Sequence, residues 1–248
     1  KPVEFFNTFR GIWLQIRAEA VFSTIQFADF NTWLLSRCLY VDLNHGHPIK
    51  DPGDEGKKGT YSYENYKFIA SKIPFYSIVA GTKTKAEYNV VPIPPEHIFI
   101  SDFARNDALF DKKLRQGQNT IVDEFKKGRK AIVYMPTQRS RGQVAMNLTD
   151  ILPLSAIQKY CEINNSVFIV KKHFYHRNES ENLSQYLNIL DVTQVEDIDP
   201  QILLCQADML ITDYSACYID YMLLKRPIVF FQYDLQQFTS TERSLYYN

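Results

Sequence analysis

The sequence predicts an α/β fold made of two Rossmann-like domains with parallel sheets. Its second half alternates short β-rich runs with helical patterns, which is typical of parallel strands joined by helical crossovers. Its first half carries further strand-like runs, separated by helical or loop segments. The chain has 248 residues, of which 45% are hydrophobic and 14% aromatic, so it can bury a sizeable core and is long enough for two domains.

The second half supplies the clearer elements. Its pattern predicts strands at Ala131–Met135, Val167–Lys171, Asp191–Val195, Met209–Thr212 and Ile228–Gln232. Helices are expected at Thr120–Lys127 and near Leu152–Ile163, Glu181–Ile189, Pro200–Ala207 and Ser215–Leu224. Gly128 is expected to terminate the first of these helices, and Pro227 marks the end of the last.

The first half is less regular. Strands are expected at Val21–Gln26, Leu39–Leu43, Phe75–Ala80 and Ile98–Ser101. Near the start, FFNTFRGIWLQIRAEA places Phe9, Trp13 and Ile16 at roughly helical spacing, with Arg10 and Arg17 between them. This pattern favours a helix whose apolar side faces the core over a helix that lies in a membrane surface, although both kinds of helix combine apolar and basic residues in this way.

The expected domain boundary lies near Lys112–Gln118, where KKLRQGQ interrupts the apolar pattern. Residues 1–115 would form the first domain, incomplete at its start, and residues 116–248 the second. Ligand would bind in the cleft between them, at the carboxyl ends of the strands. Because the chain does not begin with Met, we expect a fragment or a trimmed chain.

Composition excludes several classes of protein. Lys plus Arg and Asp plus Glu number 28 each, so no overall field attracts nucleic acid. No apolar run is long enough to cross a membrane, and no signal peptide is recognised. Glycine-rich NAD and ATP phosphate loops are also missing, so no such cofactor is expected. The four cysteines lack C-x-x-C spacing and are expected to be small core residues in a reducing compartment.

The stretch ADMLITDYSACYIDY (Ala207–Tyr221) is the most informative part of the chain. A short apolar run stops at Thr212 and Asp213, and a helical pattern begins at once. A strand that runs into a helix N-terminus offers free backbone N–H groups and the positive end of the helix dipole, which together favour phosphate. Ser215 would add a hydroxyl. The alternative is that Asp213 or Ser215 only caps the helix.

Two histidine loops carry further candidates. His45 follows the expected strand Leu39–Leu43, in a loop where an imidazole could take a proton near neutral pH, although most loop histidines are surface residues. His173 follows Lys171 and Lys172 at the end of another strand, where positive charge could neutralise a phosphate. Metal-ligand pairs are conceivable at His45-x-His47 and His173-x-x-His176, but no cysteine accompanies them, and no metal is expected.

Five segments follow the order found in one enzyme family. The run from Ala207 to Asp234 resembles the phosphate-binding segment of the CDP-glycerol glycerophosphotransferase family, the teichoic acid primases and polymerases. NHGHPIK (Asn44–Lys50) is similar to the family's His-Gly-Thr-Pro-Leu-Lys segment, and DFARNDALF (Asp102–Phe110) to its Gly-Tyr-Pro-Arg-Asn-Asp segment. MPTQRSRG (Met135–Gly142) is similar to its Ala-Pro-Thr-Trp-Arg-Asp segment, and VKKHF (Val170–Phe174) to its Lys-Leu-His-Pro segment. The sequence departs from the pattern at His47, Gln138, Ser140 and Phe174.

The resemblance implies a fold like that of the GT-B glycosyltransferases, with two domains facing across a cleft. The implied reaction moves a polyol phosphate, first of all glycerol phosphate, from a CDP-linked donor to a hydroxyl, with release of CMP. The implied acceptor is a cell-surface polymer or its lipid-linked precursor. The location would be cytoplasmic, and peripheral contact with the inner face of the cell membrane is left open.

The resemblance also implies roles for particular residues. His45 would be the general base, and His173 would bind the phosphates or assist departure of the nucleotide. Donor or phosphate contacts are implied for Pro136, Thr137, Arg139, Lys171, Thr212, Asp213 and Ser215. Acceptor or phosphate contacts are implied for Gly46, Lys50, Arg105, Asn106, Arg141 and Asp220.

Two other functions stay open at this stage. A sugar-nucleotide glycosyltransferase of surface polysaccharide synthesis shares the architecture, and a fold alone does not set the donor. A non-catalytic nucleotide-binding module is suggested by the departures at Gln138, Ser140 and Phe174.

Overall fold

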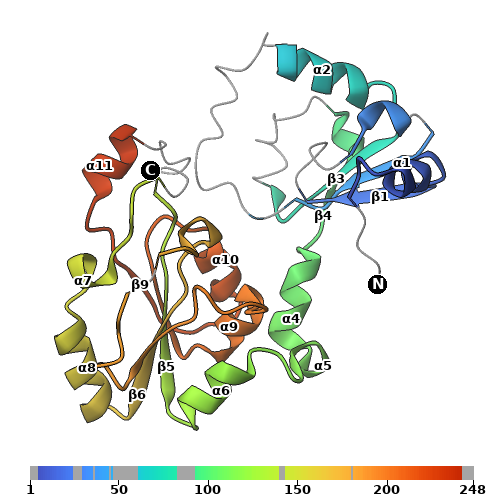
Figure 1. Ribbon diagram of the computed structural model, residues 1–248. Coiled ribbons are helices and arrows are strands. Elements are labelled where there is room, and N and C mark those ends of the chain that lie inside the picture. The colour runs from blue at the N-terminus through green and yellow to red at the C-terminus, as the bar shows by residue number, and fades with distance from the viewer. Residues whose placement is uncertain are drawn as a thin grey trace. The chain divides into compact units, whose positions relative to one another are not determined.

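The computed structural model describes residues 5–24, 30–35, 37–44, 46, 61–82, 93–139, 143–179 and 181–241. They form two compact units that divide between Ala104 and Arg105 (Figure 1). The division precedes the boundary expected at residue 115. The reason is that α4 (Asp107–Phe110) packs against α9 (Pro200–Gln206) and buries Leu109 in the core of the second unit.

The first unit contains a parallel sheet of four strands in sequence order. They are β1 (Ala20–Ser23), β2 (Leu39–Asp42), β3 (Phe75–Val79) and β4 (Ile98–Ile100). Each lies within a strand expected from the sequence or within one residue of it. The core of the unit includes Tyr40 and Phe75, whose stacked rings lie 5.1 Å apart, and Ala70 of α2 (Tyr61–Ala70).

Helix α1 (Phe9–Ile16) of the first unit corrects one expectation. Its apolar side chains face solvent, with Phe9 96% and Trp13 55% exposed, and its buried residues are Gly11 and Gln15. The Gln15 amide donates to the Phe6 and Gly11 carbonyls and accepts from the Asn31 N–H. This hydrogen bonding turns the polar side inward. The expectation that α1 faces the core with its apolar stripe is therefore wrong.

Glycine is required on this inner side of α1. A Cβ at position 11 would lie 2.1 Å from the Phe5 carbonyl oxygen, which is far inside contact distance. The close approach of the preceding turn to the helix thus depends on Gly11.

The second unit contains a five-stranded parallel sheet with the order β7-β6-β5-β8-β9. The strands are β5 (Lys130–Met135), β6 (Ser166–Val170), β7 (Ile189–Asp191), β8 (Met209–Thr212) and β9 (Ile228–Phe230). The first strand of this unit, β5, lies at the centre of the sheet, and the direction in which successive strands are added reverses between β5 and β8. This is the doubly wound topology of a Rossmann-like domain, as the sequence predicts.

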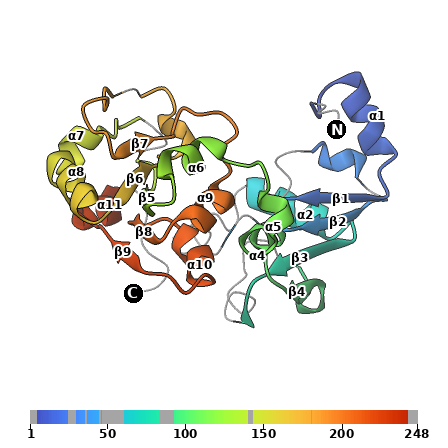
Figure 2. The same ribbon diagram turned by 90° about the horizontal axis from the view of Figure 1, so that it is seen from below.

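Helices cover both faces of this sheet (Figures 1 and 2). One core is formed with α6 (Thr120–Lys126), α9 and α10 (Cys217–Met222) and takes Ala131 and Val133 from β5. The other is formed with α7 (Leu148–Ile151) and α8 (Leu154–Ile163) and takes Ile132 and Tyr134. Alternate residues of β5 therefore serve opposite faces, and this fixes the register of the central strand.

One predicted helix and one predicted strand differ from the structure. No helix forms over Glu181–Ile189, because the Glu181 carboxylate accepts from the N–H groups of Leu148 and Thr149 and Asn182 closes a local turn with Ser184. Strand β7 ends at Asp191, earlier than expected, because the Asp191 side chain accepts from the Thr193 N–H and turns the chain.

Three of the four cysteines are buried, as predicted for small core residues. Cys38, Cys161 and Cys205 are buried and unbridged, and Cys217 is half-buried and also unbridged. None of the described helices has the length and apolar character needed to cross a membrane.

Candidate functional site

The candidate site lies at the carboxyl ends of β5 and β8 in the second unit. These strands are neighbours, and Met135 pairs with Thr212, so both strands end at the same level. Because the strand order reverses between them, the loops that follow diverge toward opposite faces of the sheet. In open α/β sheets, ligands bind in the crevice at this point.

The loop after β5 is tied to the turn after β8. The buried Asp213 carboxylate accepts from the Thr137 N–H at 2.7 Å and from the Arg139 guanidinium at 2.9 Å. The Thr212 hydroxyl donates to the Met135 carbonyl at 2.7 Å. Both side chains expected to contact phosphate therefore bind protein groups, and they hold the two loops in place.

Arg139 is a buried cation between two carboxylates. Besides Asp213, it binds Asp234 through Nε at 2.7 Å and through Nη2 at 3.0 Å, and it donates to the Thr137 carbonyl at 2.7 Å. Burial by itself lowers the pKa of the guanidinium. The hydrogen bonds and charges of Asp234 and Asp213 outweigh burial and raise this pKa further above its ordinary value.

Aromatic rings surround Arg139 and attach α11 (Leu235–Thr241) to the site. The guanidinium carbon lies 5.3 Å from the Tyr214 ring centre, 5.9 Å from that of Tyr233 and 5.1 Å from that of Phe238. The rings of Tyr214 and Phe238 stack at 3.9 Å. Ion pairing and cation–π contacts together position Arg139, so it acts as a structural centre of the two loops.

Several hydrogen-bond donors at the site have no partner among the described residues. The Thr137 side chain is 5% exposed, yet its hydroxyl makes no hydrogen bond within the described chain. In the same part of the chain, the backbone N–H groups of Ser215 and Ala216 also find no acceptor. The Ser215 hydroxyl accepts from the Cys217 N–H over a long distance, 3.5 Å, and also hydrogen-bonds the Cys217 thiol. Buried donors normally have partners, so these groups can take oxygen atoms of an anion.

Lys171 and His173 follow β6, beside the central strand. Lys171 is half-buried, and burial lowers the pKa of its amine against the opposing influence of the Asp191 charge. The His173 ring accepts from the Tyr175 N–H through Nδ1 at 3.4 Å and lies against the rings of Phe174 and Tyr175. Both residues lie at the carboxyl edge of the sheet, where the sequence placed them.

A buried network beneath this loop was missed by the sequence reasoning. His176 is fully buried, contacts Glu179 at 2.7 Å through Nδ1, and accepts from the Arg139 N–H at 3.4 Å through Nε2. Lys172 is also buried and binds Glu179 at 3.1 Å and Glu181 at 3.5 Å. These contacts join the loop after β6 to the loop after β5. The spacing His176-x-x-Glu179 is the signal from which this contact could have been found.

The charge of Glu179 is set by this network. Burial raises the pKa of its carboxyl, but the hydrogen bonds from His176 and Lys172 outweigh burial, and the net pKa lies below its ordinary value.

Arg105, Asn106 and Asp220 form a separate cluster of the second unit. The Arg105 guanidinium binds the Asp220 carboxylate through two nitrogens, at 2.9 and 3.1 Å. The Gln201 amide donates to Asn106 at 2.7 Å and to Asp220 at 3.3 Å. These contacts tie the start of the unit to α9 and α10, and they give the predicted acceptor contacts an evident structural role.

The predicted general base lies outside the described residues. His45, Lys50 and Arg141 are among the residues whose placement is not described, whereas Gly46 is described with a φ of 144°. Its neighbour Asn44 is anchored, because its amide donates to the Ser77 hydroxyl at 3.1 Å and the Ile78 carbonyl at 2.7 Å. Asn44 is therefore held in place just after the carboxyl end of β2.

The described residues include no group of three or more His, Cys, Asp or Glu side chains arranged to hold a metal ion. His45 and His47 are not among these residues.

The two parallel α/β sheets and the loops at the β5–β8 reversal define a protein of the GT-B-like class. The fold of this chain is similar to that of a solved structure of the wall teichoic acid polymerase TagF in which one histidine is replaced by asparagine. The TM-score is 0.73 and the sequence identity 22%, and the match covers 98% of this chain and 61% of that one. The sequence matches the CDP-glycerol:poly(glycerophosphate) glycerophosphotransferase family over residues 1–248, and the chain belongs to this family.

Curated relatives agree with the family match. The chain is 30% identical over 203 residues to the teichoic acid ribitol-phosphate polymerase TarL of Staphylococcus aureus, covering 75% of this chain and 33% of the relative. It is 28% identical over 224 residues to a teichoic acid poly(glycerol phosphate) polymerase of Bacillus spizizenii, covering 84% and 55%. The chain thus spans about a third to a half of the length of these relatives.

Proposed function

We propose that this chain transfers a polyol phosphate from a CDP-linked donor to a hydroxyl of a polymeric acceptor. One observation carries the proposal. In a member of this family, donor groups without partners lie at the β5–β8 reversal, where an anionic ligand is expected. Glycerol phosphate is the first candidate because the family is described by CDP-glycerol, and relatives named for ribitol phosphate make that polyol the second.

The proposed reaction is a single displacement at phosphorus. The acceptor oxygen attacks the phosphate that carries the polyol, the bond from that phosphorus to the bridging oxygen breaks, and CMP leaves with the electron pair. His45 takes the proton of the attacking hydroxyl. The donor arrives already activated, so positioning and electrostatics can supply most of the catalysis.

Each donor-binding residue then has a defined task. The hydroxyl of Thr137 and the N–H groups of Ser215 and Ala216 bind phosphate oxygens, because these groups have no partner in the described chain. The Ser215 hydroxyl, which is held only by Cys217, adds a further hydrogen bond. Lys171 and His173 supply charge beside the leaving CMP. Arg139 is bound to Asp213 and Asp234, so it acts by positioning the Thr137 N–H and carbonyl rather than by meeting the ligand.

Release of CMP tests the proposal directly. The protein is incubated with a short acceptor and, in turn, with CDP-glycerol, CDP-ribitol and UDP-linked sugars. CMP release with formation of a phosphodiester supports the proposal. Nucleotide release from a UDP-sugar with a glycosidic product would instead identify a glycosyltransferase, and no release from any donor would favour a binding module.

The His45→Ala variant tests the general base. Transfer should fall by about a hundredfold or more while CDP affinity changes little, because the base acts on the acceptor's proton. Both quantities are measured on the folded variant, with His97→Ala as the control. Near-normal transfer by His45→Ala would remove this assignment.

The Ser215→Ala variant tests the donor site. CDP affinity should weaken by about 1–3 kcal/mol, since one donor to a phosphate is lost. Calorimetric titration with CDP measures the effect, and Ser184→Ala is a control away from the β5–β8 loops. Unchanged affinity would exclude Ser215 as a phosphate ligand.

We also propose that the exposed stripe of α1 contacts an anionic membrane surface. Phe9, Trp13 and Ile16 are exposed on α1, which contains Arg10 and is followed by Arg17, and Arg17 lies over the Trp13 ring at 4.8 Å. Apolar and aromatic side chains beside cations suit the lipid interface. Sedimentation with anionic vesicles tests it. Phe9→Ser with Trp13→Ser should abolish binding, and equal binding by variant and wild type would contradict it.

A further inference from the structure

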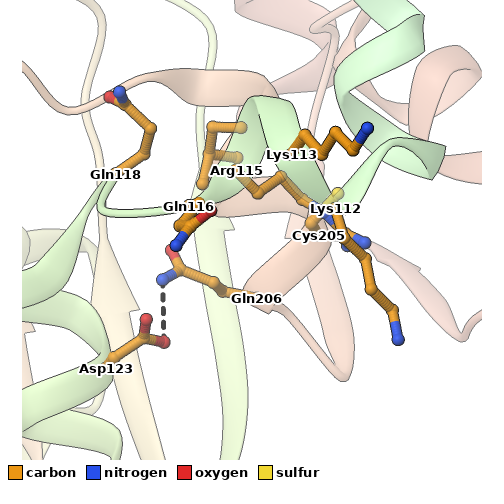
Figure 3. A pocket seen from close by; sticks show the side chains of 9 residues that line it. Lys112, Lys113, Arg115, Gln116, Gln118, Asp123, Cys205 and Gln206 are labelled. Atoms are coloured by element: carbon orange, nitrogen blue, oxygen red, sulfur yellow. Dashed lines mark hydrogen bonds between the residues drawn. The ribbon is translucent and has the colours of Figure 1, made fainter.

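A cavity on the second unit lies away from the candidate site. Its volume is about 480 Å³, and it is lined from α5 (Lys112–Arg115), the following loop, α6 and α9 (Figure 3). Gln206 of its wall ends α9, just before the amino end of β8, whereas the candidate site lies at the carboxyl end of that strand. The cavity and the candidate site are therefore at opposite edges of the sheet.

The cavity wall carries three cations and one carboxylate, Asp123, and none of the cations is paired with it. Lys112, Lys113 and Arg115 lie within one helical turn, and none makes an ion pair or a side-chain hydrogen bond to any described residue. The neighbouring Lys126 differs, because it binds Asp208 at 2.8 Å. Three cations held close together without a partner repel one another, and a bound polyanion would relieve this repulsion.

The rest of the wall consists of three side-chain amides, one carboxylate and the apolar side chains of Ile202 and Cys205. The amides are those of Gln116, Gln118 and Gln206 (Figure 3). The carboxylate of the wall, Asp123, accepts from the Gln206 amide at 2.9 Å and so is bound to an amide rather than to one of the three cations. Amides both donate to and accept from hydroxyl groups. The wall thus offers partners for phosphates and for hydroxyls.

We propose that this cavity binds a segment of a polyol-phosphate chain, the polymer that the proposed function extends. Lys112, Lys113 and Arg115 bind its phosphodiesters, and the amides of Gln116 and Gln118 bind the hydroxyls between them. The assignment rests on the proposed function, which brings such a polymer to the protein. A chain held here stays attached between additions, so the cavity favours long products over single additions.

Binding of a fluorescent poly(glycerol phosphate) oligomer to the whole protein tests the proposal. Combined Lys112→Gln, Lys113→Gln and Arg115→Gln substitutions should weaken binding by about tenfold or more, because three phosphate contacts are lost. A control with Lys127→Gln, Lys159→Gln and Lys225→Gln removes equal charge from exposed positions outside the cavity wall and should bind like the wild type. Equal weakening in both variants, or in neither, would overturn the proposal.

Competitors identify the ligand. Inorganic phosphate, single-stranded RNA and polyphosphate are each added to the complex with the labelled oligomer. The proposal expects unlabelled polyol-phosphate oligomer to compete best. Phosphate or RNA competing equally well would assign the cavity to another ligand, and equal competition by polyphosphate would show that the hydroxyls are not recognised.

A double variant of the glutamines tests the recognition of hydroxyls separately from charge. Gln116→Ala combined with Gln118→Ala leaves the three cations in place, so it should weaken binding of the oligomer but not binding of polyphosphate. This variant keeps the proposal testable even where the triple variant fails to fold.

The lengths of the products test the effect on polymer synthesis. With a short acceptor, CMP release by the triple variant should equal that of the wild type, while its products on a long acceptor become shorter. Loss of CMP release in the wild type would refute the proposed function alone, since oligomer binding is measured without donor.

Discussion

Arg139 and the cations of the cavity wall lie in the same unit but in opposite electrostatic settings. Arg139 is buried, with two carboxylates and three aromatic rings around it. Lys112 and Lys113 are exposed, and neither pairs with a carboxylate in the described part of the chain. The first arrangement uses a cation to build the protein, and the second leaves cations available to a partner. The difference shows that a basic residue near a ligand site is not thereby a ligand.

The largest expected effect comes from breaking the buried arrangement. Arg139→Met removes the cation and leaves Asp213 and Asp234 without their partner, so the free energy of unfolding should fall by about 3–5 kcal/mol. Urea denaturation measures it, with exposed Arg177→Met as the control. A loss no larger than that of the control would mean that the ion pairs do not stabilise the loops.

A smaller, pH-dependent effect is expected at Glu179. Its pKa is depressed in the folded protein, so its contribution is present above the unfolded-state pKa and is lost as pH falls through the lower folded-state pKa. Glu179→Gln should therefore cost about 1–3 kcal/mol at neutral pH. The difference in the free energy of unfolding between this variant and the wild type should become smaller in acid, below about pH 4. Unfolding free energies measured across this range, with exposed Glu196→Gln as the control, decide it. A pH-independent difference would assign the effect to packing.

The smallest effect is expected at the cavity wall. Each of Lys112→Gln and Lys113→Gln should change the free energy of unfolding by no more than about 0.5 kcal/mol, because exposed side chains without partners contribute little. Thermal denaturation measures it. A large destabilisation would show that these lysines serve the fold, and the contrast with Arg139 would disappear.

The strands were predictable from local sequence. Met209–Thr212 matches β8 residue for residue, because a short apolar run ends abruptly at a polar turn. The parallel sheet with helical crossovers followed from the α/β alternation, whereas the order of its strands was not predicted.

Other features depend on pairs distant in the sequence. Nothing near Arg139 indicates Asp213 or Asp234, so the sequence assigned Arg139 to phosphate whereas the structure gives it protein partners. The orientation of α1 was mistaken for a related reason, because Gln15 binds Asn31 from a separate segment and turns the helix. Apolar spacing indicates a helix but does not say which side finds a partner.

The buried and unbonded hydroxyl of Thr137 allows the site to distinguish between ligands of equal shape. A donor oxygen placed against this hydroxyl completes a hydrogen bond, whereas a methyl group of the same size leaves the hydroxyl buried and unbonded in the complex. The penalty for such a group is about 1–3 kcal/mol, or roughly tenfold or more in affinity. In the proposed donor complex, Thr137 therefore acts less by attracting the correct donor than by rejecting uncharged mimics of a phosphate.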